Sequence, residues 1–195
     1  MMRIITGRAR GVRLDTLAGE NTRPTSERAK EAVFSMIQFE IQGKEVLDLF
    51  AGSGQMGLEA VSRGSKTALL CDHSREAVAV IRSNAIKTKL APFCEIVCSD
   101  YATVLRNCRR KKAFDLVFLD PPYALGVIPE VLGMLLQYGL FKEGATVVCE
   151  TGAAEDVFGK DEELSSNFDI LRQTRYGVAY VTVLRVKNEE GEILK

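Results

Sequence analysis

The most constraining feature of this sequence is a regular alternation, from Gly43 onward, of short apolar segments with longer amphipathic ones. The apolar segments have the pattern of buried strands, and they occupy residues 45–50, 67–72, 94–100, 115–120 and 145–150. The intervening segments have helical spacing, and they occupy residues 55–63, 74–89, 101–111 and 127–139. Strands that are apolar throughout and joined by helices are typical of a parallel sheet with helices on both faces. The sequence therefore predicts an α/β protein.

The two ends of the chain have different patterns. Residues 168–186 form two strand-like segments that meet at Tyr176-Gly177 with no helix between them. They predict a C-terminal antiparallel hairpin, which would give a seven-stranded, mainly parallel sheet. Residues 1–24 include "RIITGRARGVRL" and predict an N-terminal β-hairpin appendage, after which Thr25 or Ser26 can cap a helix. We expect all 195 residues to form a single domain.

The composition narrows the class of protein. The sequence is 46% hydrophobic, and its 26 basic and 26 acidic residues cancel. There is no apolar segment long enough for a membrane span and no charged-then-apolar signal at the start, so we expect a cytoplasmic protein without a membrane partner. Five scattered cysteines and a single histidine predict neither a disulfide framework nor a metal site.

A glycine-rich loop follows the first predicted strand, in the segment "DLFAGSGQMG" at residues 48–57. Gly52, Gly54 and Gly57 fit the pattern G-x-G-x-x-G between a strand and a helix, which indicates a nucleoside-containing ligand. The spacing is compatible with both NAD and S-adenosylmethionine. Asp48 favours the second, because a carboxylate at the strand end suits a cationic amino acid better than a pyrophosphate.

Acidic residues also end the next two predicted strands, on the edge of the sheet where ligands bind. Asp72 can accept hydrogen bonds from both ribose hydroxyls, and Asp100 can accept one from the adenine amino group. His73 is interpreted as a loop residue near the cofactor and not as a catalytic base. The candidate cofactor-binding residues are Asp48, Phe50, Gly52, Gly54, Asp72, His73, Asp100 and Tyr101.

The fourth predicted strand ends abruptly in Asp120, Pro121, Pro122 and Tyr123. An exocyclic amino or amide nitrogen is a poor nucleophile because its lone pair is delocalised. Two acceptors, the Asp120 carboxylate and the Pro121 carbonyl, can orient that nitrogen toward an electrophile, and the prolines make the turn stiff. Tyr123 offers a flat surface for a planar base. These four residues are the candidate catalytic residues.

Taken together, several segments resemble the bacterial RsmD family. The segments are "ITGRARGVRL", "TRPTSERAKEAVFSMI", "VLDLFAGSGQMGLEAVSRG" and "FLDPPY". The resemblance spans nearly the whole chain and implies a Rossmann-like class I methyltransferase that uses S-adenosylmethionine. It also implies methylation of a guanine N2 amino group in 16S ribosomal RNA, within an assembled small subunit or its precursor, and no obligate protein partner is evident. One departure is Ser74, where many relatives have a second acid; it is expected to cap the next helix.

Arginines near the N-terminus are the candidate RNA-binding residues. Arg8, Arg10 and Arg13 lie in the predicted hairpin, and Arg23 precedes the first helix. Arginine suits phosphate because its guanidinium group binds in a bidentate manner. Because an N-terminal extension can lie over the cofactor edge, we expect these side chains to frame the pocket entrance.

Three alternatives remain open at this point. The first is a DNA adenine-N6 or cytosine-N4 methyltransferase, but only 67 residues separate Gly52 from Asp120, which leaves no room for a target-reading insertion. The second is a protein glutamine methyltransferase, a family in which Asn usually replaces Asp120. The third is a non-catalytic nucleotide-binding or RNA-binding module, which would have no need of Asp120 and Tyr123.

Overall fold

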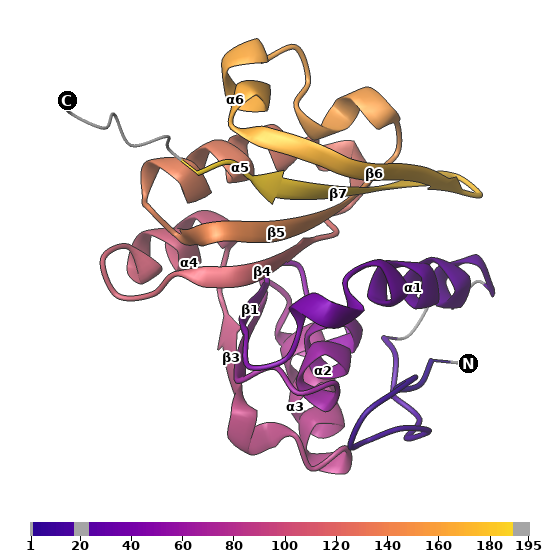
Figure 1. Cartoon of the computed structure of the whole chain (residues 1–195). Helices are drawn as coiled ribbons and strands as arrows, with labels where there is room; N and C mark the ends of the chain where they lie inside the picture. Colours follow the sequence, from indigo (N-terminus) through magenta and orange to yellow (C-terminus); the bar gives the residue numbers. More distant parts are fainter. Residues whose placement is uncertain (1, 18–23, 189–195) are drawn as a thin grey trace.

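The centre of the molecule is one seven-stranded sheet, with strand order β3-β2-β1-β4-β5-β7-β6 (Figure 1). The structure is a computed structural model that describes residues 2–17 and 24–188, with the side chains of residues 24–27 left out. The strands are β1 (Glu45–Asp48), β2 (Thr67–Asp72), β3 (Cys94–Cys98), β4 (Phe114–Leu119), β5 (Phe141–Thr151), β6 (Phe168–Tyr176) and β7 (Ala179–Val186). Strands β1 to β5 are parallel, whereas β7 pairs antiparallel with both β5 and β6. The predicted fold class is confirmed.

Helices cover both faces of the sheet (Figure 1). One face carries α1 (Pro24–Met36), α2 (Gln55–Ser62) and α3 (Arg75–Lys87), and the other carries α4 (Tyr101–Cys108), α5 (Ile128–Gln137) and α6 (Glu162–Ser166). Short 3-10 turns are η1 (Gln38–Glu40), η2 (Ala91–Phe93), η3 (Tyr123–Leu125) and η4 (Ala154–Val157). No helix in the described ranges is long and apolar enough to cross a membrane.

Two hydrophobic cores lie on opposite sides of the sheet because successive strand residues point to opposite faces. Val46 and Leu116 belong to the core under α1, α2 and α3, and their neighbours Leu47 and Val117 belong to the core under α4 and α5. All four side chains are at most 1% exposed. Burying each of them contributes about 1.5–3 kcal/mol, so the central strands are held from both sides.

Most element boundaries lie within two residues of the predicted ones, and the larger differences are at α4, β5 and α6. Helix α4 ends at Cys108 because the chain turns through Arg110, whose φ is 62°. Strand β5 begins at Phe141, four residues before the predicted start, and its first residues pair with β4 at Phe114. Helix α6 was not predicted, since its five residues are too few to show a helical period.

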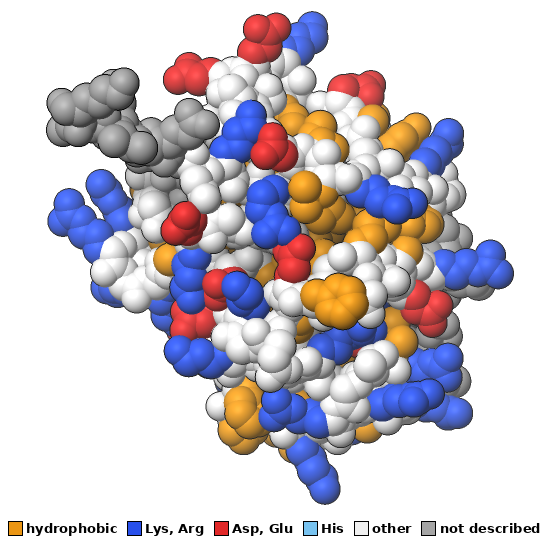
Figure 2. All heavy atoms as spheres, in the orientation of Figure 1, with side chains coloured by type: hydrophobic (Ala, Val, Ile, Leu, Met, Phe, Trp, Pro, Cys, Tyr) orange, Lys and Arg blue, Asp and Glu red, His pale blue; other side chains and the backbone are white. Residues whose placement is uncertain are grey.

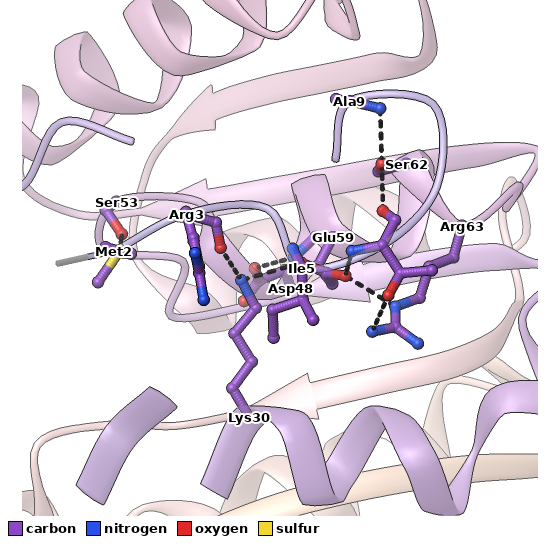
Figure 3. A network of polar contacts seen from close by, with 12 residues as sticks. Met2, Arg3, Ile5, Ala9, Lys30, Asp48, Ser53, Glu59, Ser62 and Arg63 are labelled. Carbon is purple, nitrogen blue, oxygen red and sulfur yellow. Dashed lines mark hydrogen bonds and ion pairs between the residues drawn. The ribbon is translucent and has the colours of Figure 1, made fainter. Parts of the chain in front are cut away.

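The N-terminal segment comprises residues 2–17. Its first part contacts α2 through Ile5, Thr6 and Ala9 (Figure 3), whereas the Asp15 N–H donates to Asn84 of α3 over 2.8 Å. Its two arms meet at one antiparallel bridge, between Arg3 and Arg13, so the predicted hairpin is reduced to a short loop without regular strands. The buried carboxylate of Glu59 accepts hydrogen bonds from the backbone N–H groups of Ile5 (2.7 Å) and Thr6 (3.0 Å). A helix side chain therefore satisfies the backbone N–H groups of Ile5 and Thr6, whereas those of Ile4 and Leu14 donate to carbonyl groups of the opposite arm.

The turn of this segment is packed closely against the end of α2. The Ser62 hydroxyl donates to the Thr6 carbonyl (2.7 Å) and accepts from the Ala9 N–H (3.0 Å). At Gly7, where φ is 89°, a Cβ atom would lie 1.9 Å from the Ser62 carbonyl oxygen. A side chain there would force the turn off the helix, so this position requires glycine.

Candidate active site

The site lies where the order of strands in the sheet reverses direction. Strand β1 pairs with β2 on one side and with β4 on the other, with Asp48 opposite Phe118. Beyond the paired ends, the Leu49 N–H donates to the Phe118 carbonyl over 3.3 Å. The glycine loop after β1 and the Asp-Pro-Pro-Tyr turn after β4 are therefore neighbours, although 67 residues separate Gly52 from Asp120. Ligands of open α/β sheets bind at such switch points.

The glycine loop has the backbone geometry that its sequence predicts. Gly52 and Gly54 have φ values of 53° and 80°, in the left-handed region that favours glycine, and Gly54 is the N-cap residue of α2. Asp72, at the end of β2, holds the loop in place. Its Oδ2 accepts from the Gly52 N–H, and its Oδ1 accepts from the Ser74 N–H, each over 2.9 Å. The Ser74 hydroxyl in turn accepts from Ala77 and caps α3, as predicted.

An open cavity of about 480 Å³ adjoins this loop. Its lining includes residues from three loops and the end of the N-terminal segment: Leu17, Phe50, Gly52, Asp72, His73, Ser74, Ala77 and the four residues Asp120 to Tyr123. The structure thus brings together the predicted cofactor residues Phe50, Gly52, Asp72 and His73 with the predicted catalytic turn. A carboxylate, a phenyl ring and exposed glycine backbone suit a ribose, an adenine and the chain that joins them. The described residues contain no cluster of three or more His, Cys, Asp or Glu side chains that could hold a metal ion.

Asp48 lies beneath the loop and does not line the cavity. Its side chain is buried (3% exposed), and its Oδ2 accepts from the Gly57 N–H over 2.8 Å. Burial raises the pKa of Asp48 to about 7, and the nearby Asp72 charge adds to the rise, while the Gly57 hydrogen bond opposes it. Gly57 fits tightly here, because a Cβ would lie 2.8 Å from Leu70 Cδ2. The contact that the structure assigns to Asp48 is with the first turn of α2, and its predicted cofactor contact stays a prediction.

Asp100 is also outside the cavity lining. It is exposed and caps α4, with Oδ1 accepting from the Thr103 N–H over 2.8 Å, and that hydrogen bond holds the pKa of Asp100 below its usual value. The next residue, Tyr101, packs its ring 5.7 Å from that of Phe50, which does line the cavity. Tyr101 therefore contacts a residue of the cavity lining, and its own predicted cofactor contact stays a prediction. The adenine contact proposed for Asp100 stays a prediction.

The predicted catalytic turn, Asp120 to Tyr123, is held by a residue that sequence reasoning did not select. The Tyr123 hydroxyl donates to Glu150 Oε1 over 2.6 Å, and the Tyr123 ring packs on Gly152, where a Cβ would lie 3.3 Å from Cδ2. Glu150 is near the end of β5, next to β4 in the sheet. The signal was available, because Glu150 ends the predicted strand 145–150 as Asp72 ends strand 67–72.

A second, smaller pocket of about 80 Å³ lies between α1 and the sheet. Its polar lining residues are Lys30, Gln55, Asp120 and Glu150, and the others include Ala29, Val33, Met56, Phe118, Leu119, Val148 and Val181. Figure 2 shows hydrophobic side chains, flanked by Lys and Arg, on the surface between α1 and the β6–β7 hairpin. Asp120 lines both this pocket and the larger cavity, so its side chain stands at the boundary between them.

Of the predicted RNA-binding arginines, Arg8, Arg10 and Arg13 are exposed, but the turn that carries the first two does not frame the cavity. The Arg8 N–H donates to the carbonyl of Ser62, the last residue of α2, and the Arg8 guanidinium lies 4.6 Å from the Phe93 ring centroid. The glycine loop is at the other end of α2, about 12 Å away along a helix of this length. The expected position of Arg8 and Arg10 at the pocket entrance is therefore wrong. Arg23 lies outside the described residues.

Comparison with known proteins agrees with this geometry. The profile of the family described as conserved hypothetical protein 95 matches residues 2–185. The chain is 31% identical over 185 residues to the "Putative rRNA methyltransferase YlbH" of Bacillus subtilis, covering 94% of this chain and 98% of the relative. It is 30% identical over 180 residues to ribosomal RNA small subunit methyltransferase D of Haemophilus influenzae, covering 91% and 90%.

A solved structure extends the likeness to three dimensions. The "Putative methyltransferase yhhF" from Escherichia coli superposes with a TM-score of 0.82 at 26% identity, over 96% of this chain and 99% of that one. The glycine loop, the catalytic turn and the cavity between them lie within the matched residues. The chain therefore belongs to the conserved hypothetical protein 95 family, the RsmD-type methyltransferases.

Proposed function

We propose that this protein methylates the exocyclic N2 amino group of a guanine in the 16S RNA of the small ribosomal subunit. The observation that carries the proposal is the position of Asp120, which borders both the cofactor cavity and the pocket under α1. An amine held at Asp120 faces the cofactor on one side, while the rest of its base has a separate, partly apolar site on the other.

The chain supplies binding and orientation. When bound, S-adenosylmethionine supplies a methyl group whose C–S bond breaks, with its electron pair left on sulfur, as the new N–C bond forms. The Asp120 carboxylate and the Pro121 carbonyl accept hydrogen bonds from the two amine hydrogens, which directs the nitrogen lone pair toward the methyl carbon. Tyr123, fixed by Glu150, offers its ring to the base. After transfer, the surplus proton on nitrogen passes to water at the exposed Asp120.

Ribosomal RNA is the favoured substrate because of the relatives, whose names refer to rRNA and to the small subunit. The chain covers nearly all of both relatives, so no target-recognition domain of theirs is missing from it. A separate observation argues against a DNA methyltransferase: regular strand–helix units fill the 67 residues between Gly52 and Asp120, which leaves no room for a target-reading insertion.

The surface charge fits a substrate that is already part of a particle. The net charge is zero, which gives little general attraction to naked RNA, so we expect an assembled small subunit or its precursor to supply further contacts. Arg8, Arg10 and Arg13 would bind phosphates along α2, away from the reacting base. A small-subunit substrate would also place the protein in the cytoplasm.

The test is methyl transfer from radiolabelled cofactor to four substrates in parallel: small-subunit particles, naked 16S RNA, duplex DNA and total protein. The particles should be labelled best, and digestion of their RNA should give N2-methylguanosine. Label in N6-methyladenine of DNA or in glutamine would support a rival function. Absence of label from all four would favour a non-catalytic binding module.

A further inference from the structure

We propose that Glu150 determines the choice of guanine by accepting a hydrogen bond from its N1–H group, in the pocket between α1 and the sheet. This inference rests on the proposed function. It assigns a specificity role to a residue that the Asp-Pro-Pro-Tyr chemistry does not require, since Asp120 and Pro121 already provide acceptors for both hydrogens of the amine.

The pocket has the composition of a site for a flat, partly apolar ring. Its walls are aliphatic or aromatic, and only Lys30, Gln55, Asp120 and Glu150 bring polar groups to it. Ligand sites are typically lined by apolar side chains and contain a small number of polar groups that point to the ligand. Those polar groups determine which ligand is bound. Asp120 lies at the boundary between this pocket and the cofactor cavity. If the amine of a base is held at Asp120, the edge of the ring next to that amine lies within this pocket.

Guanine differs from the other amino-bearing bases at the ring position beside the amine. In guanine, N1 carries a hydrogen and is a donor next to the N2 amine. In adenine and cytosine, the ring nitrogen beside the amine has a lone pair and is an acceptor. A carboxylate beside Asp120 therefore attracts guanine and repels the other two, because an ionised carboxylate only accepts hydrogen bonds.

Glu150 is the carboxylate in the right place. It lines the same pocket as Asp120, and β5 pairs with β4, so the ends of these two strands are neighbours. Its Oε1 accepts from the Tyr123 hydroxyl over 2.6 Å, which fixes the side chain next to the catalytic turn. A carboxylate has acceptor capacity beyond that one bond, so anchoring Tyr123 and reading N1–H are compatible.

The experiment compares guanine with 2-aminopurine, which keeps the reactive amine but has an acceptor lone pair at N1. Once the methylated nucleotide is mapped with the wild-type protein, 16S RNA is assembled by ligation with either base at that position. Single-turnover rates are measured at saturating S-adenosylmethionine. The wild-type protein should prefer guanine by at least about 10²-fold, because 2-aminopurine sets a lone pair against a carboxylate. Glu150→Gln should narrow this preference at least about tenfold, because its amide can donate to N1.

Two control variants distinguish the proposed hydrogen bond from guanine N1–H to Glu150 from the hydrogen bond that the Tyr123 hydroxyl donates to Glu150. Tyr123→Phe removes the hydrogen bond to Glu150 but keeps the carboxylate, so it should lower both rates and reduce the preference for guanine less than Glu150→Gln does. Glu155→Gln removes a similar charge from the exposed η4 turn and should change neither the methyl-transfer rates nor the preference for guanine. An equal preference in the wild type and Glu150→Gln would overturn the specificity role while the proposed function stands. If the wild-type protein methylates no guanine at all, the proposed function itself fails, and this is visible before any variant is made.

Discussion

Lys30 Nζ lies 3.1 Å from Glu59 Oε2, in an ion pair whose two side chains are 3% and 0% exposed (Figure 3). The same ammonium group donates to the Arg3 carbonyl over 3.1 Å, and Arg63 Nε donates to Glu59 Oε1 over 2.8 Å. One buried carboxylate therefore joins α1 and α2 to the N-terminal segment. Since Lys30 also lines the pocket under α1, this network fixes one wall of the proposed base site.

Glu59→Ala should strongly destabilise the protein. It removes the carboxylate that pairs with the buried Lys30 ammonium and accepts from two partly buried backbone N–H groups, and removing one partner of a buried ion pair costs about 3–5 kcal/mol. Urea unfolding should show this loss, and hydrogen exchange should show early loss of protection at Ile5 and Thr6. Glu76→Ala, at an exposed position of α3, is the control and should change stability by less than about 0.5 kcal/mol. A stable Glu59→Ala variant with a protected N-terminal segment would contradict the role of this network.

Asp72→Ala should weaken S-adenosylmethionine binding by about 1–3 kcal/mol, which is the cost of leaving polar groups without a charged acceptor. The loss has two sources, because the carboxylate lines the cavity and also holds the Gly52 N–H. Calorimetry with the cofactor and with its demethylated product measures the change, and NAD should not bind.

Asp100→Ala is the informative comparison for the cofactor site. Because Asp100 caps α4 and does not line the cavity, we expect a smaller loss of cofactor affinity than for Asp72→Ala. Equal losses in the two variants would show that adenine reaches Asp100 and that the cavity extends to α4.

Asp48 should make stability depend on pH. Its pKa rises from an ordinary value of 3.8 to about 7 on folding, so between these values the folded state binds more protons than the unfolded one. The free energy of unfolding therefore falls as pH rises from about 4 to about 7 and is level above that range. Asp48→Asn removes this pH-dependent contribution. The free energy of unfolding of the variant should therefore be about 1–4 kcal/mol higher than that of the wild type at pH 8, and the two values should be closer at pH 5. Denaturant titrations of the cofactor-free protein test it; a constant difference at the two pH values would be evidence against a protonated Asp48.

The strand pattern and the loop motifs could be predicted from the sequence, because both features depend on the chemistry of neighbouring residues. Continuous apolar strands such as Leu116–Leu119 predict a buried parallel sheet, and glycine at positions 52 and 54 permits the positive φ values that the loop has there. Their position at the edge of the sheet follows from the fold class, so the meeting of glycine loop and catalytic turn was also predictable.

Polar contacts between residues far apart in the sequence could not be predicted in this way. Nothing local in "GLEAVSRG" indicates that Glu59 binds the backbone of Ile5 and Thr6, 54 and 53 residues away. That contact draws the Arg8 turn to the far end of α2, which is why its predicted position was wrong. Asp48 differs from Asp72 for a related reason, since only packing against α2 shows which of two strand-end acids faces the cavity.

Replacing Arg8, Arg10 and Arg13 together by Gln should raise the KM for the RNA substrate without changing cofactor affinity. Each lost phosphate contact reduces the slope of log affinity against log salt by about 0.7–0.9, so the slope should fall by about 2. A matched triple variant, Arg109, Arg110 and Lys111 to Gln, removes the same charge beyond the end of α4. If the second variant and not the first flattens the salt dependence, the RNA lies along α4 and not along α2.

Asp120→Ala should abolish most methyl transfer while leaving the fold intact. Asp120 is exposed and is outside both hydrophobic cores, so unfolding and cofactor affinity should stay near the wild-type values. The single-turnover rate at saturating cofactor should fall by about 10²-fold or more, the scale of losing one preorganised polar contact at a reacting centre. Asp120→Asn should lose less, because its amide oxygen still accepts one hydrogen bond from the amine.

The Tyr123 variants separate orientation of the amine from stacking of the base. Tyr123→Phe keeps the ring and loses only the hydrogen bond to Glu150, so its rate should fall less than that of Asp120→Asn. Tyr123→Ala also removes the surface on which the base stacks, which contributes about 1–3 kcal/mol in single-strand binding, so its KM should rise as well. Should Asp120→Ala turn over at nearly the wild-type rate, Asp-Pro-Pro-Tyr would be a rigid turn only, and another group would have to orient the amine.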